Sequence, residues 1–183
     1  MKISVIGGGY AGLVTGACLS GLGHAVTIVD VDPAKVQMIN AKKPPIYEEQ
    51  LEDLLQKNCG DRLCASTSYE SVSNSDLTFI CVGTPSNSDG SANLAYVKSA
   101  CISVGKELKK ILNYQVVVVK STVPTGTTER IVCPWCYNLA RKRQARSDLQ
   151  QTLSFYRRDR RSRISCTRTG SSSGASMTGH LTG

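Results

Sequence analysis

The chain has 183 residues, a length that suits one domain with an appended segment, and its net charge is +8 at pH 7. Residues 1–131 hold 12 basic and 12 acidic residues, so the whole net charge resides in residues 132–183. The sequence has no apolar run of about 18 residues and no apolar secretory-signal core at its N-terminus, so we expect a cytoplasmic protein without a membrane partner.

The hydrophobic pattern predicts alternating strands and helices from the N-terminus onward. Pro33 suits the first turn of a helix, because its missing N–H would be unpaired there, and Asn93 is a suitable N-cap for a later helix. Residues 116–119 are all valine, as expected for a strand covered on both faces. We predict strands over residues 3–6, 25–29, 63–67, 77–82 and 116–119, and helices over residues 10–22, 33–41, 48–57 and 93–112, with another helix beginning near residues 125–128.

This order of elements indicates an α/β fold with a doubly wound, mostly parallel sheet and helices on both faces. From about Val132 the periodicity fails: residues 157–163 form an arginine cluster, and residues 167–183 are nearly all Ser, Thr and Gly. Such a composition cannot bury enough apolar surface to offset its ordering entropy. We therefore predict an ordered domain over residues 1–131 and a disordered basic tail over residues 132–183.

A glycine motif follows the first predicted strand and opens the first predicted helix. Gly7, Gly9 and Gly12, with Tyr10 and Ala11 between them, form the pattern G-x-G-x-x-G. In a Rossmann domain the first glycine permits a tight turn, the second lets a pyrophosphate approach the backbone, and the third lets the helix pack closely on the strand. The phosphates then meet the free N–H groups at the helix N-terminus. We therefore predict a dinucleotide site here.

Asp30 ends the second predicted strand, where a carboxylate can accept hydrogen bonds from ribose hydroxyls. Because a carboxylate repels a 2′-phosphate, NAD is favoured over NADP as the cofactor. Lys35 could reach the adenosine ribose or a phosphate, or could be a solvated helix lysine. Thr84 and Thr122 each follow a strong strand, where ligands bind in doubly wound sheets, but threonine also caps loops often.

At this point the chain resembles the N-terminal part of the UDP-glucose/GDP-mannose dehydrogenase family, and of its UDP-glucose 6-dehydrogenases in particular. The resemblance covers residues 1 to about 131. It is carried by residues 6–13, 30–35, 45–48, 81–85, 89–97 and 120–128, of which the last two blocks are far more specific than the glycine motif. Within the matched part, Glu49 and Gln50 stand where the family usually has Pro-Gly, and Asn93 stands where Asp is common.

The resemblance implies an enzyme that oxidises the 6-hydroxymethyl group of a UDP-hexose to a carboxylate in two NAD-linked steps. It implies that Asp30 and Lys35 hold the adenosine end of NAD, and that Thr84 and Thr122 line the cofactor site. The family's nucleophilic cysteine, its Lys and Asn near the oxyanion, its later glutamate, its dimerisation helix and its UDP-sugar domain cannot be placed in this sequence. We therefore expect no catalytic residue in this chain and an inactive fragment.

The resemblance also implies a sixth strand after Thr122, for which the sequence offers no candidate, so we expect a sheet that is incomplete at one edge. A change of reading frame near Val132 is our hypothesis for the tail. A rival hypothesis is a stand-alone NAD-binding module whose basic tail contacts nucleic acid or another partner. The arginine cluster lacks interleaved aromatic residues, so a solvated run is favoured over a nucleic-acid site.

The eight cysteines lie mostly singly inside apolar runs and are interpreted as small buried side chains rather than a disulfide framework. Cys133 and Cys136 form a C-x-x-C motif, which in other contexts is redox-active or half of a zinc site. No second such pair and no histidine pair follows it. We therefore expect no metal site, and favour a structural role for these cysteines.

Overall fold

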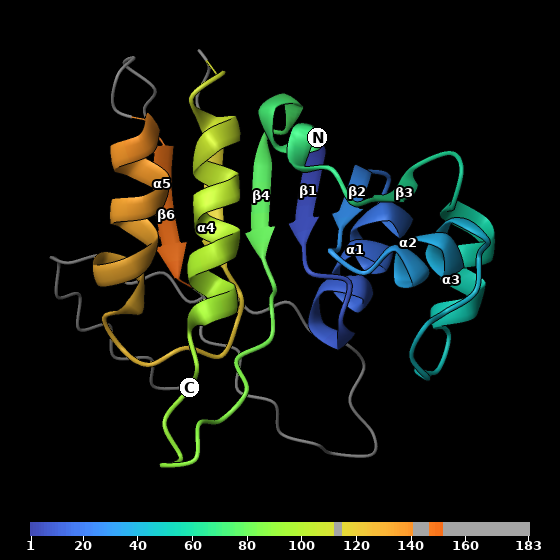
Figure 1. The fold of residues 1–183 in the computed structure, drawn as a ribbon. Helices are drawn as coiled ribbons and strands as arrows, with labels where there is room; N and C mark the ends of the chain where they lie inside the picture. The colour runs from blue at the N-terminus through green and yellow to red at the C-terminus, as the bar shows by residue number, and fades with distance from the viewer. Residues whose placement is uncertain (112–114, 141–146, 152–183) are drawn as a thin grey trace, which may run out of the picture.

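The computed structural model describes residues 1–111, 115–140 and 147–151. Its elements alternate between strands and helices along the chain (Figure 1). They are β1 (Lys2–Ile6), α1 (Tyr10–Gly21), β2 (Ala25–Val29), α2 (Pro33–Asn40), α3 (Leu51–Asn58), β3 (Leu63–Ser66), the 3-10 helix η1 (Tyr69–Asn74), β4 (Leu77–Ile80), α4 (Ala95–Leu108), β5 (Gln115–Val119), the π-helix η2 (Thr128–Val132), α5 (Cys133–Ala140) and β6 (Ser147–Gln151).

The strands form one six-stranded sheet in the order β3-β2-β1-β4-β5-β6, and every neighbouring pair is parallel. The chain adds strands outward from β1 in one direction and then, beginning with β4, in the other. The expected doubly wound α/β fold is confirmed. The order reverses between β1 and β4, and the crevice beyond the carboxyl ends of these two strands is where such sheets bind ligands.

Local sequence explains where several helices begin. Asp32 accepts a 2.9 Å hydrogen bond from the N–H of Ala34, and Pro33 occupies the first turn of α2. Asn93 accepts a 2.9 Å bond from the N–H of Ala95, although Leu94 holds the cap position of α4. Both side chains satisfy N–H groups that a helix leaves unpaired at its start.

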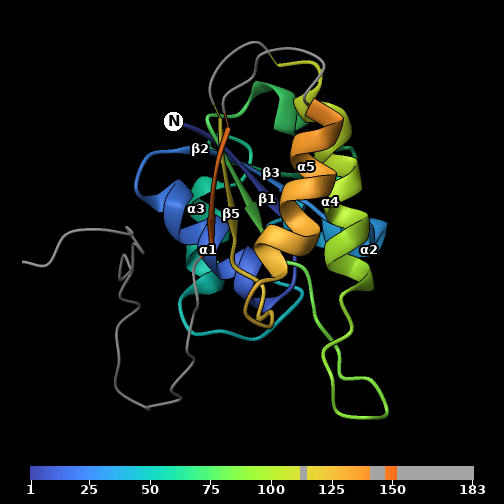
Figure 2. The same cartoon turned by 90° about the vertical axis from the view of Figure 1, so that its left-hand side faces the viewer.

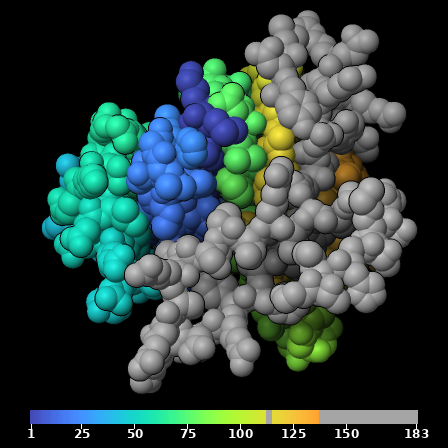
Figure 3. Space-filling model, turned by 180° about the vertical axis from the view of Figure 1, so that it is seen from behind, coloured from blue at the N-terminus to red at the C-terminus, as the bar shows by residue number. Residues whose placement is uncertain are grey.

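Two apolar clusters lie on the two faces of the sheet. One joins the inward side chains of β1, β2 and β3 with those of α1, α2 and α3. The other joins β4 and β5 with α4, η1 and α5. Figure 2 shows α4 and α5 on one side of the sheet and α1 and α3 on the other, and Figure 3 shows α1 (blue) beside α3 (teal) from behind. Because all neighbouring strands are parallel, their carboxyl ends lie along the same edge of the sheet, between the two helix layers.

The structure corrects the predicted sheet edge. β6 pairs with β5 from Gln115↔Ser147 to Val119↔Gln151, so the expectation that the sixth strand is missing is wrong. The residues of β6 are Ser-Asp-Leu-Gln-Gln, which lack the β-branched and aromatic side chains that usually mark a strand. Backbone groups make the pairing, so the sequence pattern gave no signal for it.

The predicted domain boundary at residue 131 falls inside a helical segment. The π-helix η2 runs directly into α5, and Val132 and Cys136 are buried in the same apolar cluster as Val97 of α4. The folded part therefore continues past residue 131. The helix expected to begin near residues 125–128 is therefore present but longer than predicted. Pro134 lies near the start of α5, and a proline inside a helical segment normally argues against continuing the helix.

Several expectations fall on residues outside the described ranges. The arginine cluster at residues 157–163 and the Ser/Thr/Gly-rich residues 167–183 belong to this group, as does Cys166. Among the described residues, no helix is long and apolar enough to cross a membrane. Cys59, Cys81, Cys101 and Cys136 are buried as expected, whereas Cys64 is exposed.

Candidate functional site

The turn between β1 and α1 has the geometry that the glycine motif predicts. Gly7 has φ +104°, a conformation that L side chains rarely adopt, and its N–H donates a 2.7 Å hydrogen bond to the carbonyl of Val29. A Cβ at Gly7 would lie 2.7 Å from the carbonyl oxygen of Cys81. Gly7 therefore lets the chain turn sharply while it stays packed between β2 and β4.

Gly12 is tightly packed, whereas Gly9 faces open space. A Cβ at Gly12 would collide with the carbonyl oxygen of Gly7 and would lie 3.2 Å from Cβ of Cys81, so α1 can sit against the turn only with glycine here. A Cβ at Gly9 would meet no atom within 4 Å. Gly9 has φ −76°, which any residue adopts, and it precedes α1 without a side chain capping the helix. The space above Gly9 is open to a ligand.

Asp30 follows β2 and points its carboxylate at the same turn. Its Oδ2 accepts a 2.6 Å hydrogen bond from the N–H of Gly8, and its Oδ1 accepts a 2.9 Å bond from the N–H of Asp32. Asp30 is 8% exposed. Two backbone donors therefore fix the orientation of this carboxylate before any ligand arrives, as the predicted ribose-binding role requires.

Thr84 and Thr122 lie beyond the carboxyl ends of β4 and β5 and contact each other. The hydroxyl of Thr84 donates a 2.8 Å hydrogen bond to the carbonyl of Thr122. Ser121, which the sequence analysis did not single out, donates a 2.7 Å bond to the carbonyl of Val82. The two loops are thus tied together next to the crevice where the strand order reverses.

The remaining predicted residues lie on α1 and α2. Tyr10 opens α1, is 42% exposed, and its hydroxyl donates a hydrogen bond to the carboxylate of Glu48. Ala11 lies beside it in the first turn of α1, and Lys35 is half-buried in the first turn of α2, shortly after Asp32. Glu48 lies in the segment before α3, so its hydrogen bond with Tyr10 joins that segment to the start of α1. Tyr10 and Glu48 are 38 residues apart, and sequence spacing alone did not indicate their contact.

Two further side chains near the turn were not among the predicted site residues. Burial raises the pKa of the Cys81 thiol to about 12, so this cysteine is protonated at neutral pH and packs as a small apolar side chain beneath Gly12. Burial also raises the pKa of Tyr69, and the negative charge of Asp30 raises it further. Tyr69 therefore lies close enough to Asp30 to sense its charge. Among the described residues, no cluster of His, Cys, Asp and Glu could hold a metal ion.

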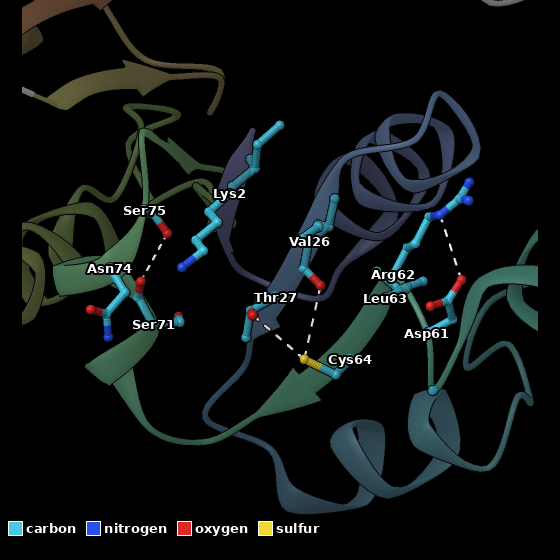
Figure 4. A pocket seen from close by; sticks show the side chains of 13 residues that line it. Lys2, Val26, Thr27, Asp61, Arg62, Leu63, Cys64, Ser71, Asn74 and Ser75 are labelled. Carbon is cyan, nitrogen blue, oxygen red and sulfur yellow. Dashed lines mark hydrogen bonds and ion pairs between the residues drawn. The ribbon is translucent and has the colours of Figure 1, made fainter.

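A separate hollow of about 360 Å³ lies at the opposite edge of the sheet (Figure 4). Its lining includes the first residues of β1, β2 and β3, which are Lys2, Ala25 and Leu63. Serine side chains, such as those of Ser71 and Ser75, also line it. Gly7 and Asp30 instead follow the last residues of β1 and β2. The hollow is therefore not part of the site at the glycine turn.

The residues at the carboxyl edge fit a dinucleotide. The open space at Gly9 and the uncapped start of α1 offer backbone N–H groups to a pyrophosphate. The fixed carboxylate of Asp30 offers acceptors to ribose hydroxyls on the neighbouring strand. The sheet thus brings an open helix N-terminus and a fixed carboxylate together at its carboxyl edge.

Comparison with known proteins agrees with this geometry. The model of the UDP-glucose/GDP-mannose dehydrogenase family, NAD binding domain, matches residues 1–155. UDP-glucose 6-dehydrogenase YwqF of Bacillus subtilis is 47% identical over 133 residues, covering 72% of this chain and 30% of the relative. GDP-mannose 6-dehydrogenase of Pseudomonas aeruginosa is 43% identical over 136 residues, covering 73% of this chain and 31% of the relative.

Solved structures show the same likeness in three dimensions. A ternary complex of GDP-mannose dehydrogenase from Pseudomonas aeruginosa matches with a TM-score of 0.81 and 38% identity, covering 86% of this chain and 37% of that one. UDP-glucose dehydrogenase from Pyrobaculum islandicum matches with a TM-score of 0.78 and 39% identity, covering 85% of this chain and 36% of that one. The chain spans about a third of the length of these relatives. It belongs to the UDP-glucose/GDP-mannose dehydrogenase family, and residues 1–155 match that family's NAD-binding domain.

Proposed function

We propose that this chain supplies the cofactor site of a UDP-glucose 6-dehydrogenase, which converts UDP-glucose, two NAD and water into UDP-glucuronate and two NADH. The observation that carries the proposal is the turn at Gly7–Gly12, which is open above Gly9 and faces the fixed carboxylate of Asp30. The 47% identity to a UDP-glucose 6-dehydrogenase favours UDP-glucose as the substrate of the complete enzyme.

Each residue of the site has a proposed part in holding the cofactor. The N–H groups at the start of α1, beginning with Tyr10 and Ala11, bind the pyrophosphate, which the positive end of the helix dipole stabilises. Asp30 accepts hydrogen bonds from the adenosine ribose, and Lys35 lies on α2 on the adenosine side. Thr84 and Thr122 line the crevice toward the nicotinamide end.

NAD supplies the hydride acceptor in each of the two oxidation steps. The chain's own contribution is to bind and orient that acceptor at the carboxyl edge of the sheet. The family nucleophile cannot be placed in this sequence, and Cys81, the buried cysteine under the turn, has a raised pKa that keeps it protonated. We therefore propose that the 183-residue chain binds NAD but does not oxidise UDP-glucose alone.

Two measurements on the full chain test this proposal. Titration calorimetry with NAD should give a saturable heat, and incubation with UDP-glucose and NAD should give no NADH by absorbance. GDP-mannose is the matched control substrate, because relatives that act on it are almost as similar. Formation of NADH with either sugar would contradict the proposed inactivity, and absence of NAD binding would contradict the proposed site.

The rival hypothesis, a stand-alone module that uses its tail to contact nucleic acid, gains no support from the described residues. Its arginine cluster lies at residues 157–163, outside them. We therefore do not advance it as a second function.

A further inference from the structure

Three cysteines meet where α5 packs against α4. Cys101 of α4 is 0% exposed and Cys136 of α5 is 1% exposed, whereas Cys133 at the start of α5 is half-buried. The thiol of Cys136 donates a 3.6 Å hydrogen bond to the carbonyl oxygen of Cys101. Cys133 lies three residues before Cys136, at the start of α5. The C-x-x-C motif thus gains a third cysteine from a neighbouring helix.

Other contacts hold this helix pair in place. Val132 is buried in the same apolar cluster as Val97 and Val104 of α4. The ammonium group of Lys98 lies 5.1 Å from the centre of the Trp135 ring, within the range of a cation–π interaction. These contacts hold α5 against α4 beside Cys101 and Cys136.

The cluster does not have the arrangement of a thioredoxin-type motif. Such motifs place the reactive cysteine at a free helix N-terminus, which lowers its pKa. Here η2 precedes Cys133 without a break, and burial together with the nearby charge of Glu129 raises the pKa of the Cys133 thiol. Burial and the neighbouring cysteines also raise the pKa of Cys136. These thiols are therefore protonated at neutral pH and react slowly.

The geometry also decides which pair can be joined. Residues three apart on a helix have Cβ atoms roughly 5–6 Å apart, whereas a disulfide needs a Cβ separation of about 3.5–4.5 Å. Joining Cys133 to Cys136 would therefore distort α5. Cys101 and Cys136 come from different helices, and the thiol of Cys136 already lies against the backbone of Cys101. The interhelical pair is the one that can close without unwinding a helix.

We propose that Cys101 and Cys136 form a disulfide that staples α5 to α4 when the protein meets a disulfide oxidant such as oxidised glutathione. Cys133, the most accessible of the three, reacts first: its thiolate attacks one sulfur of the oxidant and releases one glutathione thiolate. Cys136 then attacks the glutathione sulfur, which returns Cys133 to a thiol, and Cys101 attacks the sulfur of Cys136 and releases the second glutathione. Overall, two cysteine thiols lose two electrons and two protons, and one oxidised glutathione becomes two reduced ones.

The test oxidises the full chain with oxidised glutathione at mildly alkaline pH, alkylates the remaining thiols, and maps linked tryptic peptides by mass spectrometry. Cys101 lies on peptide 99–106, and Cys133 and Cys136 share peptide 131–141. The expected product links these two peptides. Cys136→Ser should abolish the link, and Cys133→Ser should keep it while slowing its formation at least tenfold. Cys64→Ser is the matched control, because Cys64 is exposed and lies on β3. It should change neither the product nor the rate.

Thermal unfolding supplies a second readout. The disulfide should raise the melting temperature by about 10 °C, and a reducing agent should reverse the shift. A link between Cys133 and Cys136, or glutathione retained on Cys64 or Cys133 with no link between the two peptides, would overturn the proposal. So would a link that survives in Cys136→Ser.

Discussion

The N–H of Gly8 donates a 2.6 Å hydrogen bond to Oδ2 of Asp30, which joins the turn after β1 to the end of β2. A Cβ at Gly8 would lie 3.1 Å from the same oxygen, so the approach is close. The bond links the proposed phosphate-binding turn to the proposed ribose-binding carboxylate. The carboxylate therefore cannot move independently of the glycine turn, and changes at either place should affect cofactor binding.

Alanine substitutions at two glycines of the turn should have different effects, one on stability and the other on NAD binding. Gly12→Ala places a methyl group into the carbonyl oxygen of Gly7, and we expect a loss of about 3 kcal/mol or more in the free energy of unfolding, measured by denaturant titration. Gly9→Ala meets no protein atom within 4 Å and has an ordinary φ, so we expect its stability to change by less than about 0.5 kcal/mol.

Gly9→Ala should nevertheless weaken NAD binding at least tenfold by calorimetry, because its methyl group would occupy the space that the pyrophosphate needs. An unfolded Gly9→Ala chain, or a folded one with unchanged NAD affinity, would argue that the open space above Gly9 is not the phosphate site.

The hydrogen bond between Thr84 and Thr122 should matter for the shape of the crevice. Thr84→Val keeps the size of the side chain and removes the donor to the Thr122 carbonyl, so we expect a loss of roughly 1 kcal/mol in stability and a several-fold loss in NAD affinity. Thr84→Ser keeps the hydroxyl and should retain most of the affinity. Equal affinities for the two variants would mean that the bond does not position the site.

The segment after residue 131 should contribute to folding. Val132 is the last residue of η2 and is fully buried in the apolar cluster that η2 shares with α4. Val132→Ala removes two buried carbons, so we expect a loss of about 2 kcal/mol in the free energy of unfolding. Leu22→Ala is the control, because Leu22 is 75% exposed and its truncation should leave the melting temperature unchanged. If Val132→Ala were as stable as the unsubstituted chain, the folded domain would end near residue 131.

The loop between β4 and α4 should respond to acid. Its Asp89 carboxylate accepts hydrogen bonds from the hydroxyl and the N–H of Ser91, which hold the pKa of Asp89 below its ordinary value. These bonds are present above the ordinary pKa of an aspartate and are lost as the pH falls through the lowered pKa. NMR titration of the Asp89 carboxyl carbon should show the pKa rising in Ser91→Ala. Ser88→Ala, which removes a hydroxyl from the same loop, should leave it unchanged; equal shifts in both would contradict the assignment to Ser91.

The central part of the fold and of the site was predictable because it depends on local patterns. The valines of β5, the alternation of strands and helices, and the spacing from Gly7 to Asp30 each report a local requirement of a parallel sheet or of its first turn. The bond from Gly8 to Asp30 follows from the same motif once β1 and β2 are paired.

The rest depends on contacts that distant residues make. The hydroxyl of Tyr10 reaches Glu48 across the start of α3, and Tyr69 approaches Asp30 from η1, and neither leaves a periodic trace in the sequence. β6 was missed for a related reason, and the helix expected to begin near residues 125–128 was not followed past residue 131. Their residues have weak intrinsic preferences, and Val132 and Cys136 show their role only when α4 is placed beside them.

The most direct test of the account is calorimetric titration of the full chain with NAD and with NADP, repeated on Asp30→Ala. We predict saturable binding of NAD, binding of NADP at least tenfold weaker because the carboxylate repels the 2′-phosphate, and a loss of NAD affinity of about tenfold or more in the folded variant, since a good hydrogen bond to a charged group contributes roughly 1.5–3 kcal/mol. Circular dichroism on the same samples establishes that the variant is folded, because Asp30→Ala also removes the acceptor of the Gly8 N–H. Absence of heat from NAD with the folded chain, or equal NAD affinity in the folded Asp30→Ala chain, would contradict the account.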